Sequence, residues 1–459
     1  MIKGDPVTCA KYAKDHGLLE TPGWKPLKRY AKNEKKLKRM LNQTRINSLR
    51  NAPIFKFGIQ VPRSKAEAYA LDKKNGNTFW ADAMQTELSQ LFEYKTFEDK
   101  GHIKDVGRPQ GHTFIRCHFV YDVKHDLRRK ARLVAGGHMT APPKDSVYSG
   151  VVSLRSIRLA LLAAELNGLG IMAGDVGNAY LEAETKEKIY TIAGPEFGEE
   201  LDGHILIIRR ALYGLRTSGA RWHERFAETL RAEGFKPCKA DPDLWMRDAG
   251  DKYEYICVYV DDLLCMMKDP SAFMDRLKNV YNYKLKGVGP PSYHLGANYF
   301  RDPDGTLVMG AKDYINKILT NYERMFGELP KMMVQPVETN DHPEVDTTEL
   351  LDSAGIKHYQ CLIGELQWAV SLGRYDILQA VMSMSRFRTA PRKGHLRRLK
   401  RGFGYLRKFP EGTIRFRTQV PSHQGPDHKD YDWTHSVYGN DPEEVPYDMP
   451  EPKNFQFLF

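Results

Sequence analysis

The segment Tyr259-Val-Asp-Asp262 constrains the fold of this chain more than any other, because apolar runs flank it on both sides. The runs are Tyr255-Ile-Cys-Val258 and Leu263-Leu-Cys-Met-Met267. Two strand-like apolar segments joined by a tight acidic turn predict a β-hairpin. Its tip carries adjacent carboxylates, which repel each other where the dielectric is low and therefore favour a bound cation. The alternative is an ordinary solvated turn, since Asp is a common turn residue.

A third carboxylate, Asp175, stands in a strand-like setting upstream. The segment 168–175 predicts a short strand that ends at Asp175, and Gly177 predicts a turn before a helix begins. Polymerase-type chemistry needs carboxylates from separate strands to hold two divalent ions roughly 3.5–4 Å apart. A strand-end Asp that faces the hairpin tip across a sheet would complete such a cluster. The alternative role for Asp175 is the N-cap of the following helix.

A second predicted β-hairpin is strongly basic. Residues 114–123 alternate, a turn follows at His125-Asp126, and the return strand is Arg128–Ala135. Alternation along this strand places Lys130 and Arg132 on the same face. A solvated cationic edge strand resists aggregation, and that interpretation stays open for Arg128 and Lys130.

The composition favours a soluble intracellular protein of several subdomains with a polyanionic partner. The 459 residues carry a formal net charge of +11, and Lys and Arg neutralise phosphates and release their counterions. The six cysteines are scattered singly without a Cys-x-x-Cys pair, which argues against a zinc site or a disulfide framework and indicates a reducing compartment. The first residues lack the apolar segment of a signal peptide, and no stretch is long enough to span a bilayer.

Helical spacing of apolar residues predicts five helices: residues 78–92, 153–169, 221–235, 311–326 and 359–386, the last with a break near Gly373. The first helix has an apolar stripe that predicts core packing, formed by Trp80, Met84, Leu88 and Leu91. The most basic run, Lys25–Arg50, predicts either a solvated charged helix or one that contacts nucleic acid. Beyond Phe409 the apolar period is lost, which predicts a poorly ordered linker.

An ordered series of motifs resembles the reverse transcriptases of copia-type (pseudovirid) LTR retrotransposons. The centre of the match is Asp175-Val with the aromatic Tyr180, the connecting block Leu212–Trp222, and Tyr259–Asp262. The other motifs are Phe57–Pro62, Asn75–Trp80, Lys130–Gly137, Ile189–Pro195, Lys286–Pro290 and Tyr293–Gly296. The resemblance runs from about Phe57 to Phe409 and is to the polymerase part of a Pol polyprotein.

This resemblance implies an α+β chain with the right-hand polymerase fold, which has a ferredoxin-like palm, β-hairpin fingers and a helical thumb. The implied domains are a basic N-terminal extension (1–56), fingers (57–150), a palm with finger insertions (151–310), a helical thumb (311–410) and a linker (411–459) toward a ribonuclease H domain that is missing from the sequence. The basic run His395–Arg401 on the thumb implies contact with a duplex backbone.

The resemblance also implies an RNA-directed DNA polymerase that adds dNTPs to a primer 3′-hydroxyl by a two-metal mechanism. Asp175 and Asp261 would be the principal metal ligands, with Asp262 as an outer member of the cluster. The backbone carbonyl of Val176 would supply a further hard oxygen ligand. Two Mg²⁺ ions are the expected cofactor, with Mn²⁺ as a substitute.

Four residues are implied to act on the incoming nucleotide. Arg132 would grip triphosphate oxygens with its planar guanidinium, and Lys130 is a second candidate for this contact. Tyr180 would exclude a 2′-hydroxyl by overlap with its ring; the alternative is an ordinary core tyrosine. Lys286 would protonate the pyrophosphate; the alternative is a surface lysine in a glycine-rich turn.

The chain departs from the family in one block. Thr217 stands where the family usually has Gln in the nucleotide-binding site, and a shorter hydroxyl cannot make the contacts of an amide. Gly219 replaces Pro, which predicts a looser turn before the following helix. The residues implied to support the primer end are Tyr293, His294, Leu295 and Gly296, for which a plain strand start is the alternative.

Two other functions stay open. A catalytically inactive retroelement remnant would only bind nucleic acid, which Thr217 favours and the intact carboxylates oppose. A palm-type nucleotidyl cyclase shares paired carboxylates, but this chain has no Gly-Gly-Asp/Glu-Glu-Phe hairpin. For the polymerase, the implied partners are an RNA template, a DNA or tRNA primer, the RNA–DNA hybrid and dNTPs, with no membrane partner. The implied compartment is a cytoplasmic virus-like particle or the nucleus.

Overall fold

The structure is a computed structural model that describes residues 6–17, 20, 37, 53–124, 126–143 and 146–419. These residues belong to two compact units, residues 1–141 with 186–215 and residues 142–185 with 216–459. Both units mix helices and strands, so the chain is α+β as expected. The basic run Lys25–Arg50, apart from Leu37, lies outside the described residues, and so do residues 420–459 of the expected linker 411–459. The first part of that linker is described and contains a strand, Thr413–Phe416.

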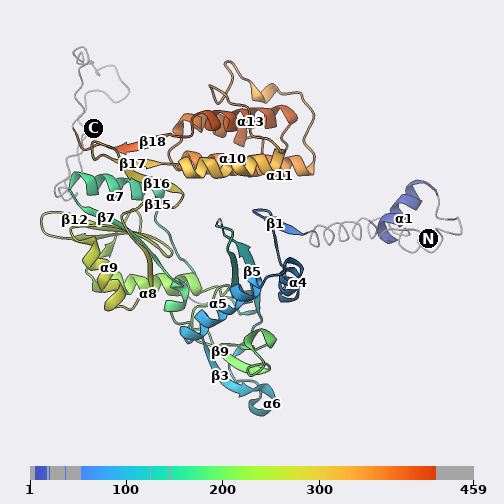
Figure 1. The fold of residues 1–459 in the computed structure, drawn as a ribbon, viewed down its shortest axis with the longest axis vertical. Helices are drawn as coiled ribbons and strands as arrows, with labels where there is room; N and C mark the ends of the chain where they lie inside the picture. Colours follow the sequence, from blue (N-terminus) through green and yellow to red (C-terminus); the bar gives the residue numbers. More distant parts are fainter. Residues whose placement is uncertain are drawn as a thin grey trace. The chain divides into compact units, whose positions relative to one another are not determined.

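The first unit combines helices with a four-stranded sheet and two hairpins (Figure 1). Among the described residues, its helices are α1 (Pro6–Asp15), α4 (Lys65–Asn75), α5 (Phe79–Glu93) and α6 (Ile103–Val106). The sheet has the order β3 (Phe97–His102), β9 (His204–Ile208), β8 (Ile189–Ile192) and β4 (Thr113–Phe114). The hairpins are β1 (Ile54–Lys56) with β2 (Ile59–Val61), and β5 (Cys117–Val123) with β6 (Arg129–Ala135).

Two predictions for this unit have different outcomes. The apolar stripe of α5 is buried, which confirms it as core. The alternating run 114–123 is not one strand, because β4 pairs with β8 whereas β5 pairs with β6. The change occurs at Ile115, whose N–H donates to the carbonyl of Tyr190 at 2.9 Å before the chain leaves the sheet.

The second unit is built on a six-stranded antiparallel sheet. Its order is β10 (Lys236–Pro237), β11 (Leu244–Asp248), β12 (Tyr253–Tyr259), β13 (Asp262–Met267), β7 (Gly170–Val176) and β14 (Leu285–Gly289). The predicted acidic hairpin is β12–β13, and the predicted strand near Asp175 is β7, its direct neighbour. The N-cap alternative for Asp175 is wrong, because Asp175 lies inside β7 and the next helical turn is the 3-10 helix η4 (Ala179–Glu182), capped at Asn178.

Both faces of this sheet are buried by helices. On one face Cys257 and Leu264 pack in a core with α7 (Leu154–Leu166). On the other face Val258 and Leu263 pack with α8 (Ser218–Ala232) and α9 (Pro270–Asn279). Figure 1 shows α7 on one side of the sheet and α8 and α9 on the opposite side. Burial on both faces explains why β12 and β13 are continuous apolar runs without alternation.

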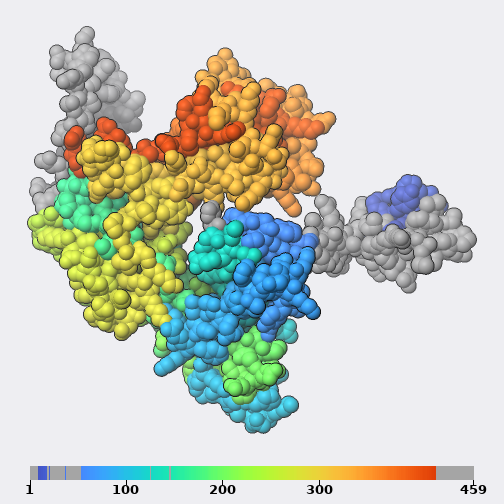
Figure 2. Space-filling model, in the orientation of Figure 1, coloured from blue at the N-terminus to red at the C-terminus, as the bar shows by residue number. Residues whose placement is uncertain are grey.

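A smaller sheet and a helical group complete the second unit. The sheet has the order β15 (Tyr293–His294), β16 (Ala297–Arg301), β17 (Leu307–Gly310) and β18 (Thr413–Phe416). The helices are α10 (Lys312–Phe326), α11 (Ser353–Ser371), α12 (Leu378–Ser385) and α13 (Lys393–Lys408). Figure 2 shows the side chains of these helices packed as one block, coloured orange to red.

The helix expected at 359–386 breaks as predicted, since Gly373 has a φ of +110° between α11 and α12. Other 3-10 turns in the part of the chain that the structure describes are η3 (Gly137–Met139), η5 (Pro195–Phe197), η6 (Pro343–Val345) and η7 (Tyr375–Ile377). Within the described ranges, no helix combines the length and apolar character that a bilayer crossing requires.

Candidate active site

The tip of the β12–β13 hairpin is a tight turn with a strained residue. Tyr259 pairs with Asp262, so Val260 and Asp261 form the connecting loop. Val260 has a φ of +58°. For a residue with a Cβ this left-handed conformation costs about 1–2 kcal/mol, and branching at Cβ makes it less favourable still. The surrounding structure must therefore hold the loop in place.

Three of the predicted site residues form a row across neighbouring strands. Asp262 of β13 lies opposite Asp175 of β7, and Asp175 lies opposite Lys286 of β14. Directly opposite residues of antiparallel strands point to the same face, with Cβ atoms about 4.5–5.5 Å apart. The sheet therefore brings a carboxylate, a second carboxylate and an ammonium together from three strands.

Asp261 is tied to the same place through the backbone. The N–H of Val176 donates to the carbonyl oxygen of Asp261 at 2.8 Å. Val176 directly follows Asp175, so this bond joins the end of β7 to the turn of the hairpin. The three predicted carboxylates thus belong to one local structure, although 86 positions separate Asp175 from Asp261 in the printed sequence.

The electrostatics of this structure are unfavourable for three negative charges. Burial and the neighbouring charges of Asp261 and Asp175 together raise the pKa of Asp262 to about 6, and burial contributes most. A carboxyl group whose ionised form is disfavoured by two other carboxylates lies where a cation would be stabilising.

The donor chemistry fits a hard divalent cation, but the side chains are not preassembled around one. Carboxylate and carbonyl oxygens are the ligands that Mg²⁺ prefers. Among the residues that the structure describes, however, no group of three or more His, Cys, Asp or Glu side chains is arranged to hold a metal ion. Asp175, Asp261 and Asp262 are therefore neighbours whose carboxylates would need to converge further to share an ion.

Lys286 lies close to the backbone that follows Asp175. A Cβ built on Gly177 would lie 3.1 Å from Cε of Lys286 and 3.4 Å from its Nζ. The absence of a side chain at position 177 therefore makes room for the lysine. Lys286 is exposed, as the alternative of a surface lysine requires, but its position in the strand row places it beside the carboxylates.

Tyr180 lies near the start of α8, and so do Thr217 and Gly219, the two residues that differ from the family's usual sequence. Tyr180 is half-buried and packs against the core beneath α8. A Cβ on Gly219 would lie 3.2 Å from Cβ of Ser149 and 4.0 Å from the hydroxyl oxygen of Tyr180, so only a small residue fits there without displacement. Thr217 is the N-cap residue of α8 and is buried, with no capping hydrogen bond from its side chain.

Arg132 and Lys130 belong to the first unit, on β6. Their neighbours Ala131 and Leu133 are buried while they are half-buried, so alternation places the two cations on one face as predicted. The guanidinium of Arg132 lies 5.1 Å from the centre of the Tyr213 ring.

A buried glutamate that the sequence interpretation missed supports this strand. Glu87 of α5 accepts a hydrogen bond from the N–H of Leu133 at 3.1 Å. Burial raises the pKa of Glu87, while the bond from Leu133 and the nearby Lys130 and Arg132 lower it. The sequence did contain one sign that Glu87 is buried: it directly precedes Leu88, which belongs to the apolar stripe of α5.

The predicted primer-supporting residues form a tight hairpin turn. His294 pairs with Ala297, and the loop residues Leu295 and Gly296 have φ angles of +50° and +89°. Two positive φ angles in a two-residue loop are typical of a type I′ turn. A Cβ on Gly296 would lie 3.1 Å from Nε1 of Trp368 on α11, so the turn packs against the helical group.

Within this turn, His294 and Tyr293 differ in exposure. His294 is buried, and burial lowers its pKa to about 4, whereas Tyr293 is exposed.

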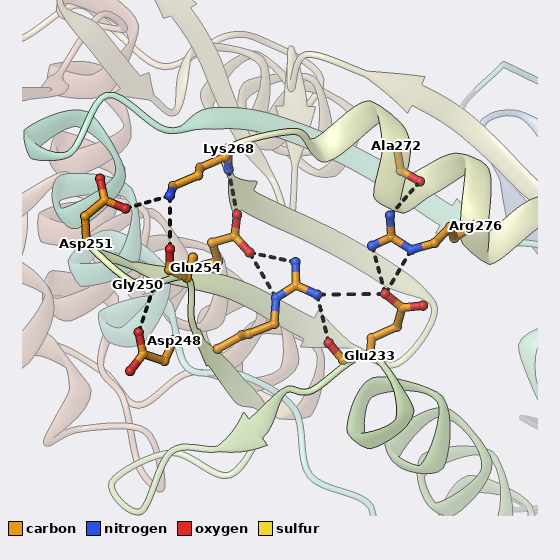
Figure 3. Close-up of polar contacts among 10 residues, drawn as sticks. Glu233, Asp248, Gly250, Asp251, Glu254, Lys268, Ala272 and Arg276 are labelled. Carbon is orange, nitrogen blue, oxygen red and sulfur yellow. Dashed lines mark hydrogen bonds and ion pairs between the residues drawn. The ribbon is translucent and has the colours of Figure 1, made fainter.

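The end of the hairpin away from its tip is held by an ionic network that the sequence did not reveal (Figure 3). Glu254 of β12 accepts hydrogen bonds from Nε and Nη2 of Arg247 at 3.0 and 2.6 Å, and from the N–H of Lys268 at 2.8 Å. Glu233 accepts two bonds from Arg276 of α9, at 3.0 and 2.8 Å. Arg247 also donates from Nη1 to the carbonyl oxygen of Glu233 at 2.8 Å. The network therefore joins β11 and β12 to α9 and to the residues that directly follow β13 and α8.

A cavity of about 380 Å³ lies in the helical group, far along the chain from the carboxylates. Its lining includes Tyr322, Val381, Met384 and Arg398. None of the predicted site residues lines it.

Comparison with known proteins gives consistent matches over the region that contains the site. The family model described as reverse transcriptase (RNA-dependent DNA polymerase) matches residues 102–333. The Retrovirus-related Pol polyprotein from transposon RE1 of Arabidopsis thaliana is 29% identical over 350 residues, which are 73% of this chain and 23% of that protein.

Two further relatives have a similar degree of sequence identity to this chain. The Pol polyprotein from transposon TNT 1-94 of Nicotiana tabacum is 27% identical over 361 residues, covering 75% of this chain and 26% of that protein. The putative transposon Ty5-1 protein of Saccharomyces cerevisiae is 30% identical over 249 residues, covering 53% of this chain and 78% of that protein. The chain thus spans about a quarter of the length of the Pol polyproteins that it matches.

Proposed function

Because the chain belongs to the reverse transcriptase (RNA-dependent DNA polymerase) family, in its copia-type retrotransposon branch, we propose that it extends a primer with dNTPs on an RNA template. The observation that carries this proposal is the strand row Asp262–Asp175–Lys286, with Asp261 in the adjoining turn. It supplies acidic groups for metal ions and a cation for phosphate on one face of one sheet.

In this proposal Asp175 and Asp261 are the principal ligands of two Mg²⁺ ions, or of Mn²⁺ in their place, and Asp262 and the carbonyl of Val176 complete the site. The bound ions would supply activation of the primer hydroxyl and neutralisation of triphosphate charge. The raised pKa of Asp262 supports this assignment, because a cation would relieve the repulsion that raises it.

The other residues act on the nucleotide and the primer. Lys286 donates a proton to the departing pyrophosphate, and Tyr180 excludes the 2′-hydroxyl of a ribonucleotide. Arg132 and Lys130 bind the triphosphate through charge-assisted hydrogen bonds. The β15–β16 turn, from Tyr293 through His294 and Leu295 to Gly296, supports the primer end. Thr217 occupies the place of the family's usual Gln in the nucleotide-binding site, and its shorter hydroxyl cannot make the contacts of that amide.

We assign the polymerase subdomains to the observed elements accordingly. The palm comprises the six-stranded sheet with α7, α8 and α9, the thumb comprises α10 to α13, and the fingers comprise the first unit. The proposed partners are an RNA template, a DNA or tRNA primer, their hybrid and dNTPs. The proposed compartment is a cytoplasmic virus-like particle or the nucleus.

A primer-extension assay tests this function directly. Purified protein, an RNA template annealed to a DNA primer, dNTPs and Mg²⁺ or Mn²⁺ should give extended primer. Asp261→Asn should lower the rate at least about a thousandfold, since removing one member of a catalytic unit removes most of its effect, while template–primer affinity stays within about twofold.

The control variant is Asp251→Asn, an exposed aspartate that pairs with Lys268 away from the hairpin tip. It should extend primers at the wild-type rate. Template–primer binding without extension by the wild-type chain would favour the inactive remnant instead, and unchanged activity of Asp261→Asn would remove the assignment of the metal ligands.

A further inference from the structure

Asp261 lies between two peptide groups, and the structure holds both of them by hydrogen bonds. The carbonyl oxygen of Asp261 accepts from the N–H of Val176 at 2.8 Å. The carbonyl oxygen of the preceding residue, Val260, accepts from Nε1 of Trp222 at 2.7 Å. Fixing the peptide planes on both sides of a Cα fixes the direction in which its Cβ points. The direction of the Asp261 carboxylate therefore depends on these two bonds.

The bond from Trp222 acts on the strained position of the turn. Val260 has its φ at +58°, a conformation that a β-branched residue leaves readily when nothing opposes it. The indole N–H donates to the carbonyl oxygen of this same residue, so it stabilises the turn at the point where the backbone is least favourable. A side-chain donor from Trp222 thus acts together with the backbone bond from Val176 to hold the tip of the hairpin.

Trp222 itself is held rigidly. Its side chain is 1% exposed, its ring stacks on Phe226 at 5.1 Å and meets the edge of Tyr283 at 5.9 Å. The hydroxyl of Tyr283 is in turn hydrogen-bonded to the hydroxyl of Thr229, at 2.8 Å. A buried indole with aromatic neighbours on two sides has one orientation, and a fixed donor can impose its geometry on the carbonyl that it contacts.

We propose that Trp222 is a positioning residue of the polymerase site, which aims the Asp261 carboxylate by hydrogen bonding to the carbonyl of Val260. This inference rests on the proposed function. Trp222 touches neither metal nor substrate; it acts through the backbone, as outer-shell partners of metal ligands commonly do.

The test compares two substitutions that make the same chemical change. Trp222→Phe removes the indole N–H and keeps an aromatic ring in the core. The matched control is Trp245→Phe, because Trp245 is 2% exposed, belongs to the same core and lies on β11 opposite Ile256 rather than at the turn. Thermal unfolding of both variants verifies that they fold.

The first readout is Mn²⁺ binding by the full chain, followed by electron paramagnetic resonance of the free ion. Trp222→Phe should weaken Mn²⁺ binding by at least about tenfold, the usual effect of losing an outer-shell partner, and Trp245→Phe should leave it within about twofold. The second readout separates kinetic constants: for Trp222→Phe, kcat of primer extension should fall about 10–100-fold while KM for template–primer is unchanged.

Two outcomes would overturn the proposal. Wild-type Mn²⁺ binding by Trp222→Phe would show that the indole does not aim the ligand, and equal losses in Trp222→Phe and Trp245→Phe would show a general packing effect. A different result would show that the polymerase assignment itself is wrong: Asp261→Asn would then bind Mn²⁺ with the same affinity as the wild-type chain.

Discussion

At the scale of single residues, Asp262 shows how the site combines burial with like charge. Its pKa is raised to about 6, first by burial and then by Asp261 and Asp175. The folded state therefore holds this proton more tightly than the unfolded chain, in which the carboxyl titrates near 3.8. It follows that the free energy of unfolding falls as the pH rises from about 4 to about 6.

Replacing Asp262 by Asn should remove this pH-dependent loss. Because the side chain is partly exposed and solvent screens its interactions, we expect Asp262→Asn to be more stable than the wild-type chain by about 1–2 kcal/mol at pH 7. At pH 4 the difference should vanish, since Asp262 is then protonated in the folded state. Urea unfolding at both pH values, without divalent ions, measures it. Asp251→Asn should show no such gain, because a hydrogen bond to Lys268 lowers the pKa of Asp251.

Tyr180 is the second residue whose role can be isolated. Tyr180→Ala should lose discrimination against ribonucleotides by about 10–100-fold, since removing a steric block of this kind is worth a few kcal/mol. Tyr180→Phe keeps the ring and should retain the discrimination. Competition between dTTP and UTP in single-nucleotide extension gives the ratio of kcat/KM values. An unchanged ratio in the alanine variant would identify Tyr180 as a core residue only.

At the scale of elements, local pattern was sufficient for the hairpin and for β7 but not for the contacts around them. The apolar runs of β12 and β13 and the acidic turn are local, and so is the strand that contains Asp175. By contrast, the position of Lys286 opposite Asp175 depends on β14 joining the edge of the sheet. The hydrogen bond from the N–H of Leu133 to Glu87 likewise joins residues in different elements. Such contacts arise from packing and carry no short-range pattern.

The ionic network at the base of the hairpin is a further example of such packing. Arg247→Leu would leave the buried Glu254 without its guanidinium partner, and breaking a buried pair on one side is strongly unfavourable. Because Arg247 is partly exposed and the N–H of Lys268 still bonds to Glu254, we expect a loss of about 2–3 kcal/mol in the free energy of unfolding. Lys312→Met breaks the exposed pair with Glu411 and should leave the midpoint of urea unfolding nearly unchanged, because water screens an exposed pair. Similar losses in urea unfolding of the two variants would contradict the importance of the network.

At the scale of the whole molecule, the chain has an excess of Lys and Arg, but α13 does not present them as one continuous basic face. The run His395–Arg401 predicted a helix that follows a duplex backbone, yet its cations are largely engaged within the helical group. Arg398 bonds to Asp341 and Asp346 at 2.8 and 2.5 Å, and Arg401 lies 3.2 Å from Glu338. These ion pairs connect α13 to the segment that precedes α11. Net charge therefore overstates the charge that is available to nucleic acid.

Two arginines of α13 allow binding of nucleic acid to be distinguished from stabilisation of the helical group. Arg397 is exposed, so Arg397→Gln should lower the slope of log K against log salt for template–primer binding by about one. Arg398→Gln should leave that slope unchanged and lower the midpoint of thermal unfolding, because its charge is already neutralised by two aspartates. Binding measured at four or more KCl concentrations resolves the slopes. A reduced slope in Arg398→Gln alone would reverse the assignment.

The division of the first unit between residues 1–141 and 186–215 has a consequence for synthesis on the ribosome. Strands β3 and β4 emerge early, but their partners β9 and β8 lie in the second segment, behind the strand β7 that belongs to the other unit. The nascent chain must therefore carry unpaired strand edges of two unfinished sheets at once, and β7 in turn waits for β13. Neither unit can be completed before the other has begun. The chain passes from one unit to the other after residues 141, 185 and 215, so a gene cut at any of these three points would yield pieces that each lack strands of a sheet.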